Sequence, residues 1–266
     1  MANETKSYFQ QKGTVISWWY PESEREPLHE HYEEQLRWVL AQANWQGARV
    51  ADIGTGKGRF AIACARQGAK VYALDIAPEM LDEAGRAAKR AGARVRFVRG
   101  DAENLPYPDR FFDIVLCMET IMHVPHPEQL VREVARIVRP GGLVIMSMTN
   151  KYRINALLRL PEELYRRLRP AKSEAPRYMW SYSVPQFRRF LHQAGLDIQT
   201  LHGQGLLQAN ARLRLGRKLS VAAFPRPFAL WFFAKVEPPL RETFLRGVMG
   251  TVMAVARPTP TSPAKR

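Results

Sequence analysis

The sequence predicts an α/β fold built on a doubly wound, mainly parallel sheet. Between Arg49 and Thr149, short apolar stretches typical of buried strands alternate with longer stretches whose apolar residues recur at helical spacing. Strands and helices in alternation form βαβ units, in which helices cover both faces of a parallel sheet. With 266 residues, 46 % of them hydrophobic, the chain can bury one large core of this kind, so disorder is excluded for most of it.

The elements follow in a regular order. After a polar, aromatic-dotted leader, the expected helices cover residues 28–43, 57–67, 78–91, 127–138 and 184–194. The expected strands cover residues 49–53, 70–74, 94–98, 113–118, 142–149, 196–201 and 251–256. Arg139 to Gly142 reads Arg-Pro-Gly-Gly, which predicts a helix stop and a turn that leads into the fifth strand.

The net charge of +15 is confined to the C-terminal part of the chain. Residues 1–150 contain 19 basic and 19 acidic side chains, whereas residues 151–266 contain 21 basic and 6 acidic ones. Folding does not require such an excess, so it indicates an anionic partner or surface. The two cysteines, Cys64 and Cys117, are too few for a disulfide scaffold and are expected to be reduced core thiols in a cytoplasmic protein.

The sequence gives no sign of secretion or of a membrane span. The first residues lack a basic segment followed by an apolar one. The most apolar later stretch, Pro227 to Val236, is far shorter than the roughly 20 residues that cross a bilayer.

A glycine-rich turn follows the first strand. It reads Asp52-Ile53-Gly54-Thr55-Gly56-Lys57-Gly58 and directly precedes a helix. Glycines at such a turn let the backbone pass close to a ligand, while the helix amides face it. The third glycine of the dinucleotide fingerprint would stand where Arg59 stands, and Asp75, at the end of the second strand, fits the ribose of NAD as well as that of other nucleosides.

Motifs further along the chain are more specific. A third strand leads into Gly100-Asp101-Ala102-Glu103-Asn104-Leu105-Pro106, and Phe111-Phe112-Asp113 opens a fourth. With these, and with EVARIVRPGG further on, the chain resembles the class I S-adenosylmethionine-dependent methyltransferases, particularly the small-molecule branch that includes ubiquinone and menaquinone biosynthesis methyltransferases. The resemblance runs from about Arg49 to Thr149. It implies a Rossmann-like seven-stranded sheet with an antiparallel last strand, helical lid insertions, and S-adenosylmethionine as cofactor.

The resemblance implies where the methionine end of the cofactor binds. The turn formed by Gly54, Thr55, Gly56 and Gly58 would run beneath it. Asp52 would hold this turn and reach the methionine ammonium directly or through water. The backbone of Cys117 and Met118, at the end of the fourth strand, would also face the ammonium and open onto the acceptor.

The resemblance also implies the adenosine site. Asp75 would bind the two ribose hydroxyls. Asp101 would accept a hydrogen bond from the adenine amino group, and the Ala102 amide would face a ring nitrogen. The side chains of Ile76 and Leu105 would sandwich the ring. Each carboxylate alone can equally be a helix cap or a turn former, but three acids, each after its own strand, favour the binding role.

Two titratable side chains after the fourth strand are candidates for the catalytic base. Glu119 and His123 are well placed to take a proton from an acceptor, and histidine titrates near neutral pH. The alternative for His123 is an ordinary hydrogen-bonded histidine. His126, between two prolines, is expected at the start of a helix, and no metal site is predicted because no further ligands accompany the two histidines at a recognisable spacing.

The implied division of the chain has four parts. These are a helical leader or lid (1–48), a cofactor-binding core (49–150), a basic helical lid with the last two strands (151–257) and a disordered Pro-rich tail (258–266). The basic part suggests a lid that also touches an anionic membrane through Arg212, Arg214, Arg217, Lys218, Trp231 and Phe232.

Three other functions are weighed against a lipophilic small-molecule acceptor. Nucleic acid is less favoured, because Cys117 and its neighbours lack the proline-containing loops of base methyltransferases. A short-chain dehydrogenase is less favoured again, because the one Tyr-x-x-x-Lys, at Tyr8 to Lys12, precedes the cofactor turn. The third alternative is a cofactor-binding protein that has lost catalysis.

Overall fold

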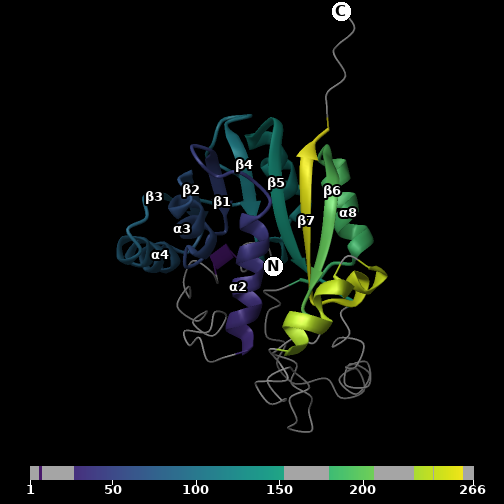
Figure 1. Cartoon of the computed structure of the whole chain (residues 1–266). Helices are drawn as coiled ribbons and strands as arrows, with labels where there is room; N and C mark the ends of the chain where they lie inside the picture. The colour runs from purple at the N-terminus through teal and green to yellow at the C-terminus, as the bar shows by residue number, and fades with distance from the viewer. Residues whose placement is uncertain (1–5, 8–26, 153–179, 207–230, 242, 260–266) are drawn as a thin grey trace, which may run out of the picture.

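The computed structural model describes residues 6–7, 27–152, 180–206, 231–241 and 243–259. Its centre is a seven-stranded sheet in the order β3-β2-β1-β4-β5-β7-β6 (Figure 1). The strands are β1 (Arg49–Ile53), β2 (Lys70–Asp75), β3 (Val95–Arg99), β4 (Phe112–Cys117), β5 (Val138–Thr149), β6 (Leu196–Gln204) and β7 (Thr251–Pro258). Only β7 runs antiparallel to its neighbours, β5 and β6. The expected doubly wound sheet with an antiparallel last strand is confirmed.

Helices cover both faces of the sheet. On one face, α2 (Pro27–Leu40) packs on α3 (Arg59–Arg66), α3 packs on β1 and β2, and α4 (Pro78–Arg90) packs on β2 and β3. On the other face lie α5 (Pro127–Ile137) and α8 (Val184–Gln193). Each amphipathic helix buries its apolar stripe against the sheet, which gives one core on each side.

Local sequence signals explain where several helices begin. Gly58 is the N-cap of α3 with φ 81°, so this helix begins two residues later than the periodicity predicts. Proline at the start of α5 follows the N-cap residue His126, as predicted. Ser183 caps α8 in a capping box with Gln186.

The Arg-Pro-Gly-Gly segment lies inside a strand and not in a turn before it. β5 already begins at Val138, which pairs with Phe112, but Ile114 pairs with Leu143. The residues between form a bulge, and Gly141 takes φ 75° there. The predicted break therefore exists as an irregularity of the ladder.

The carboxyl ends of β1 to β6 share one edge of the sheet, at the lower end of Figure 1. Near this edge lie α2 and the short turns η2 (Ile121–His123), η4 (Phe232–Val236), η5 (Pro238–Leu240) and η6 (Phe244–Val248). The chain order reverses between β1 and β4, which is where open α/β sheets bind ligands.

Several expectations fall outside the described residues. This group comprises the leader up to residue 26 apart from residues 6–7, the basic segments 153–179 and 207–230, and the tail from residue 260. Pro258 still lies in β7, and the Thr259 amide donates to the Gly195 carbonyl at 2.8 Å, so the chain is ordered two residues further than expected. Cys64 and Cys117 are buried free thiols, as predicted. Within the described residues, no helix is long and apolar enough to cross a membrane.

Candidate active site

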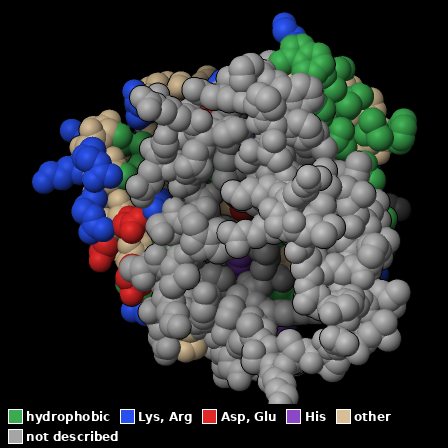
Figure 2. Space-filling view, turned by 90° about the horizontal axis from the view of Figure 1, so that it is seen from below, with side chains coloured by type: hydrophobic (Ala, Val, Ile, Leu, Met, Phe, Trp, Pro, Cys, Tyr) green, Lys and Arg blue, Asp and Glu red, His purple; other side chains and the backbone are tan. Residues whose placement is uncertain are grey.

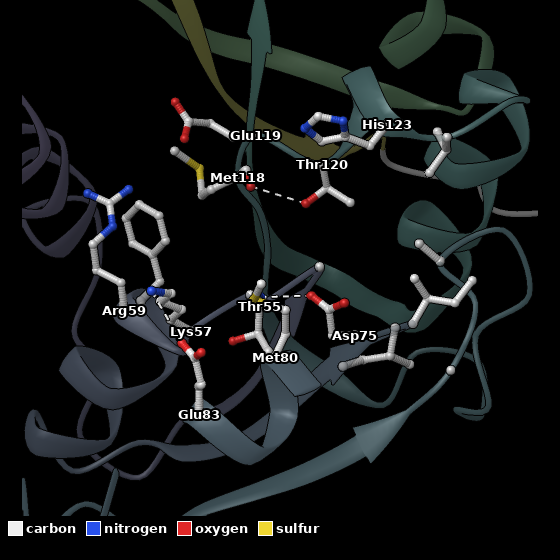
Figure 3. Close-up of a pocket in the computed structure, with 18 of the residues that line it drawn as sticks. Thr55, Lys57, Arg59, Asp75, Met80, Glu83, Met118, Glu119, Thr120 and His123 are labelled. Carbon is white, nitrogen blue, oxygen red and sulfur yellow. Dashed lines mark hydrogen bonds and ion pairs between the residues drawn. The ribbon is translucent and has the colours of Figure 1, made fainter. Parts of the chain in front are cut away.

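A cavity of about 800 Å³ opens at the carboxyl ends of β1 to β4 (Figure 3). This volume lies in the range of small-molecule sites, roughly 300–1,000 Å³. Ten of the fourteen catalytic or cofactor-binding residues predicted from the sequence line it: Gly54, Thr55, Gly56, Asp75, Ile76, Asp101, Ala102, Met118, Glu119 and His123. The other four, Asp52, Gly58, Leu105 and Cys117, are buried behind its wall.

The glycine turn forms the floor of the cavity next to β1. The Gly54 and Thr55 amides both donate to the Leu74 carbonyl, at 2.8 and 2.9 Å, which ties the turn to β2. A Cβ on Gly54 would come within 2.3 Å of the Thr120 Oγ1, so only glycine fits. A Cβ on Gly56 would meet nothing within 4 Å, which means that open space lies above this part of the turn.

Asp52 supports the turn from below. Its Oδ2 accepts from the Thr55 hydroxyl at 2.6 Å and from the Ala61 amide at 3.1 Å. The side chain is 1 % exposed. Burial raises the pKa of this carboxyl to about 6, because a charge in the interior loses its hydration.

Asp75, at the end of β2, faces the cavity. Its Oδ2 accepts from the Gly56 amide at 2.8 Å, and its Oδ1 accepts from the Ala77 amide at 3.0 Å. These bonds fix the carboxylate, and each oxygen has a further lone pair for a ligand hydroxyl. Burial raises its pKa.

Asp101, at the end of β3, is engaged by a residue that the sequence does not single out. The Lys6 ammonium donates to Asp101 Oδ2 at 2.6 Å and lies 2.5 Å from Glu103 Oε2. The Glu103 amide donates to Asp101 Oδ1 at 2.9 Å. Lys6 therefore lies at the end of the cavity at β3, through a contact across 95 residues that no local pattern signals.

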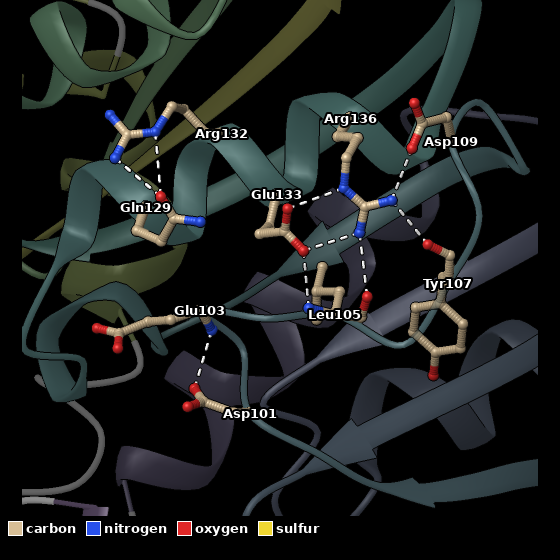
Figure 4. A network of polar contacts seen from close by, with 9 residues as sticks. All are labelled: Asp101, Glu103, Leu105, Tyr107, Asp109, Gln129, Arg132, Glu133 and Arg136. Carbon is tan, nitrogen blue, oxygen red and sulfur yellow. Dashed lines mark hydrogen bonds and ion pairs between the residues drawn. The ribbon is translucent and has the colours of Figure 1, made fainter. Parts of the chain in front are cut away.

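A polar network fixes the segment that follows Asp101 (Figure 4). The Arg136 guanidinium donates to Glu133, to Asp109 and to the carbonyls of Tyr107 and Leu105, at distances of 2.7 to 3.0 Å. Glu133 also accepts from the Leu105 amide at 2.8 Å. The Leu105 side chain is 4 % exposed and belongs to the core, whereas Val124 and Pro125 line the cavity.

The turn after β4 carries the two candidate bases. Glu119 has φ 55°, a left-handed conformation that costs a non-glycine residue roughly 1–2 kcal/mol. Its amide donates to the Ser147 hydroxyl at 2.7 Å, and the Thr120 hydroxyl donates to the Ile53 carbonyl at 2.9 Å. Burial raises the pKa of Glu119, although the nearby Arg59 opposes this. Strain of this kind is held in place by surrounding bonds and is common at functional sites.

His123 and His126 have different surroundings. His123 lines the cavity (Figure 3). The amide of His126 donates to Glu103 Oε1 at 2.6 Å, and its ring Nδ1 lies 3.4 Å from Glu103. In the described part of the chain, no three His, Cys, Asp or Glu side chains gather as a metal site would require.

Two further lining residues were not assigned a role from the sequence. Tyr32 comes from α2, which reaches over the edge of the sheet, and Arg59 is the first residue of α3. In the sequence, Arg59 stands out only as a departure from the dinucleotide fingerprint. Its contacts to α2 lie 24 and 27 residues away in sequence, so the pattern around the turn does not reveal them.

Comparison with known proteins decides the family. Residues 51–146 match the model of a methyltransferase domain. A ubiquinone biosynthesis O-methyltransferase from Thiobacillus denitrificans is 35 % identical over 189 residues, which is 70 % of this chain and 80 % of that protein. One from Xanthomonas axonopodis is 31 % identical over 206 residues, 77 % of this chain and 85 % of the relative. The chain belongs to the class I S-adenosylmethionine-dependent methyltransferases.

Solved structures agree with this methyltransferase fold. Magnesium protoporphyrin IX methyltransferase from Synechocystis PCC 6803, with bound S-adenosylhomocysteine, has a TM-score of 0.65 at 17 % identity and covers 97 % of this chain and 99 % of its own. The [4+2]-cyclase SpnF has a TM-score of 0.63 at 18 % identity, covering 96 % and 95 %.

The cofactor of this methyltransferase is S-adenosylmethionine. The cavity suits this cofactor chemically. Asp75 and Asp101 offer acceptors for the donors of an adenosine, spaced along successive strand ends, and the open space over Gly56 admits a ligand close to the backbone. When bound, the cofactor supplies a methyl group on a sulfonium, a carbon already activated for in-line displacement.

Proposed function

We propose that this methyltransferase acts on a lipophilic acceptor, such as a quinone precursor or a related lipid or secondary metabolite, at a group that must lose a proton. The observation that carries the proposal is the position of His123 and Glu119, which line the same cavity as Asp75 and the glycine turn. Curated relatives are named as ubiquinone biosynthesis O-methyltransferases, which favours a hydroxyl as the methylated group.

The residues have a limited task in such a reaction. They align the acceptor oxygen with the methyl group and exclude water from the cavity. His123 takes the proton from the acceptor hydroxyl, because imidazole has an affinity for protons suited to neutral pH. Glu119 is the second candidate, since its raised pKa makes it a stronger base than an exposed carboxylate.

A membrane surface is the proposed source of the acceptor. Three large apolar side chains of the described residues are strongly exposed: Tyr152 (50 %), Trp231 (54 %) and Phe244 (87 %). Tyr152 follows the carboxyl end of β5, and the other two belong to the insertion between β6 and β7 that ends at the same edge. Seen toward this edge, apolar side chains gather on one rim beside residues that are not described (Figure 2).

One of the aromatic residues expected to insert into the membrane is replaced by another. Phe232 is 8 % exposed, so its side chain is part of the core and cannot insert into a bilayer in this conformation. Phe244, at the start of η6, is the more exposed aromatic residue and replaces it. Arg212, Arg214, Arg217 and Lys218 lie outside the described residues and stay a prediction from the sequence. Binding at the cytoplasmic face of a membrane would bring the cavity to an acceptor dissolved there.

Two other functions are alternatives to this proposal. The basic C-terminal part would also suit RNA, which binds cations through its phosphates. The other alternative is a protein that binds the cofactor without transferring its methyl group.

The test of the proposed function is methyl transfer into a cell lipid extract. The purified protein is incubated with the extract and methyl-labelled S-adenosylmethionine, and mass spectrometry searches for a lipid that gains one labelled methyl group. We expect one labelled product, with turnover lowered by about 10²-fold or more in His123→Ala while cofactor binding is unchanged. Label in RNA and none in lipid would contradict the proposal, as would no transfer to any extract. Full activity in His123→Ala would move the base role to Glu119, which Glu119→Gln then tests.

A further inference from the structure

The methionine end of the cofactor carries a carboxylate as well as an ammonium, and the residues discussed so far leave the carboxylate without a cation. Five basic side chains line the described part of the cavity: Lys6, Lys57, Arg59, Arg86 and Arg90. They lie at different positions along the sheet edge, so each one faces a different part of a bound cofactor.

Four of the five lie away from the methionine end or are already paired. Lys6 is at the end of β3, where it binds Asp101 and Glu103. Lys57 lies 3.2 Å from the Glu83 carboxylate, and Arg86 and Arg90 are exposed on α4, the helix that follows the ribose site on β2.

Arg59 is at the methionine end. It begins α3 directly after the glycine turn, beside the ends of β1 and β4. Figure 3 shows its guanidinium on the same side of the cavity as Met118 and Glu119. Burial raises the pKa of Glu119 and of Asp52, and the positive charge of Arg59 opposes both shifts, so its field reaches this end of the cavity.

The guanidinium of Arg59 is held in one place by α2 and by two aromatic rings. One terminal nitrogen donates to the Tyr32 carbonyl at 2.7 Å, and the other donates to the Gln35 side-chain oxygen. The guanidinium carbon lies 4.8 Å from the centre of the Tyr32 ring and 4.2 Å from that of Phe60. Five N–H donors in a rigid fork allow an arginine to serve acceptors on α2 and a carboxylate together.

We propose that Arg59 binds the α-carboxylate of the cofactor and thereby selects ligands that retain the amino-acid end. Because the same guanidinium is bonded to α2, the carboxylate becomes a further acceptor at the joint between α2 and α3. This inference rests on the cofactor and not on the acceptor proposed above, so either can fail alone. The competing explanation is that Arg59 only fastens α2 to α3.

The test compares two ligands that differ at the amino-acid end. S-adenosylhomocysteine has the carboxylate, whereas 5′-methylthioadenosine has the same adenosine and thioether sulfur without it. Calorimetry should show that Arg59→Met weakens S-adenosylhomocysteine binding about 10- to 100-fold, the loss of one charge-assisted pair. Binding of 5′-methylthioadenosine should change less than about threefold, which also shows that the variant is folded. Arg59→Lys, which keeps the charge without the fork, should recover part of the affinity.

Arg66→Met is the matched control, because Arg66 is an exposed arginine at the other end of the same helix. It should leave both affinities unchanged. An equal loss of both ligands in Arg59→Met would assign Arg59 to the joint between the helices and overturn the proposal. Unchanged affinity for both ligands would overturn it as well.

Discussion

Asp52 illustrates, at the scale of one residue, how the site stores an unfavourable charge. Folding raises the pKa of its carboxyl from 3.8 to about 6 through burial. Between these two values the folded chain holds a proton that the unfolded chain has released. The free energy of unfolding contributed by this group therefore falls as the pH rises through that window, and the cost is fully present above about pH 6.

Asp52→Asn should stabilise the protein near neutral pH. Both hydrogen bonds to Asp52 end on Oδ2, so an amide oxygen in that position keeps them while the charge is removed. We expect the free energy of unfolding in urea to rise by at most about 3 kcal/mol above pH 6 and to match the wild type near the unfolded pKa. Binding of S-adenosylhomocysteine should weaken in the same variant, because its ammonium loses a nearby anion.

Asp113→Asn is the control with the opposite sign. Burial raises the pKa of Asp113, but the Arg49 amide and the Arg139 guanidinium outweigh it, so the net shift is downward. This carboxylate contributes stability that is present above its unfolded pKa and is lost as the pH falls. Its replacement should lower stability at neutral pH. Lower stability at neutral pH in both variants would contradict the explanation for Asp52.

The positions of single residues in the cavity were predictable only where they depend on a strand end. Asp75 and Asp101 follow their strands directly, and parallel strands bring their carboxyl ends to one edge, so the sequence places them together. Lys6 and Arg59 reach their partners through tertiary contacts with distant segments, which a pattern within one stretch does not record. Leu105 illustrates the reverse case, because an apolar residue beside a motif is as suited to the core as to a ligand.

At the scale of elements, the existence of each strand was easier to predict than the residue at which an element begins. The apolar stretches of β1, β4, β5 and β7 are buried in the sheet as their composition indicates, whereas the edge strand β3 has no fully buried residue. The start of α3 depends on the left-handed Gly58, and the start of β5 depends on a bulge at Gly141. Both starts depend on a glycine with positive φ, and the spacing of apolar residues on either side does not reveal such a backbone conformation.

The element that contains Phe244 provides the test of membrane binding. Phe244→Ala should weaken binding to vesicles containing anionic lipid by about 10- to 100-fold, because burying a phenylalanine contributes roughly 1.5–3 kcal/mol. Replacing Arg212, Arg214, Arg217 and Lys218 by Gln should weaken it further and remove its salt dependence. Co-sedimentation measures both effects. The same substitution at Phe232 would not test membrane binding, because this side chain is buried.

Two results would contradict the membrane proposal. One is equal binding of the wild type to neutral and anionic vesicles. The other is salt-sensitive binding to RNA without binding to vesicles, which would favour the nucleic-acid alternative. Cofactor affinity should stay unchanged in Phe244→Ala, because η6 contributes no residue to the cavity that the structure describes.

At the scale of the whole molecule, the neutral part (residues 1–150) and the basic part (residues 151–266) have different tasks. The neutral part contains the strands and turns that line the cofactor cavity, and periodicity with motif order was sufficient to predict its fold. The basic part contains the insertions around β6, where irregular apolar and basic stretches predict no clear period. Its excess of basic side chains and its exposed aromatic residues indicate a surface that binds an anionic partner.

The most direct test of the whole account is a calorimetric titration of the wild type and of Asp75→Ala with S-adenosylhomocysteine and with NAD. We expect that one S-adenosylhomocysteine binds per chain and that NAD does not bind. We also expect Asp75→Ala to lose about 10- to 150-fold in affinity, because two charge-assisted bonds to the ribose contribute roughly 1.5–3 kcal/mol. Tight binding of NAD without binding of S-adenosylhomocysteine would contradict the cofactor assignment, and unchanged affinity in Asp75→Ala would contradict the site.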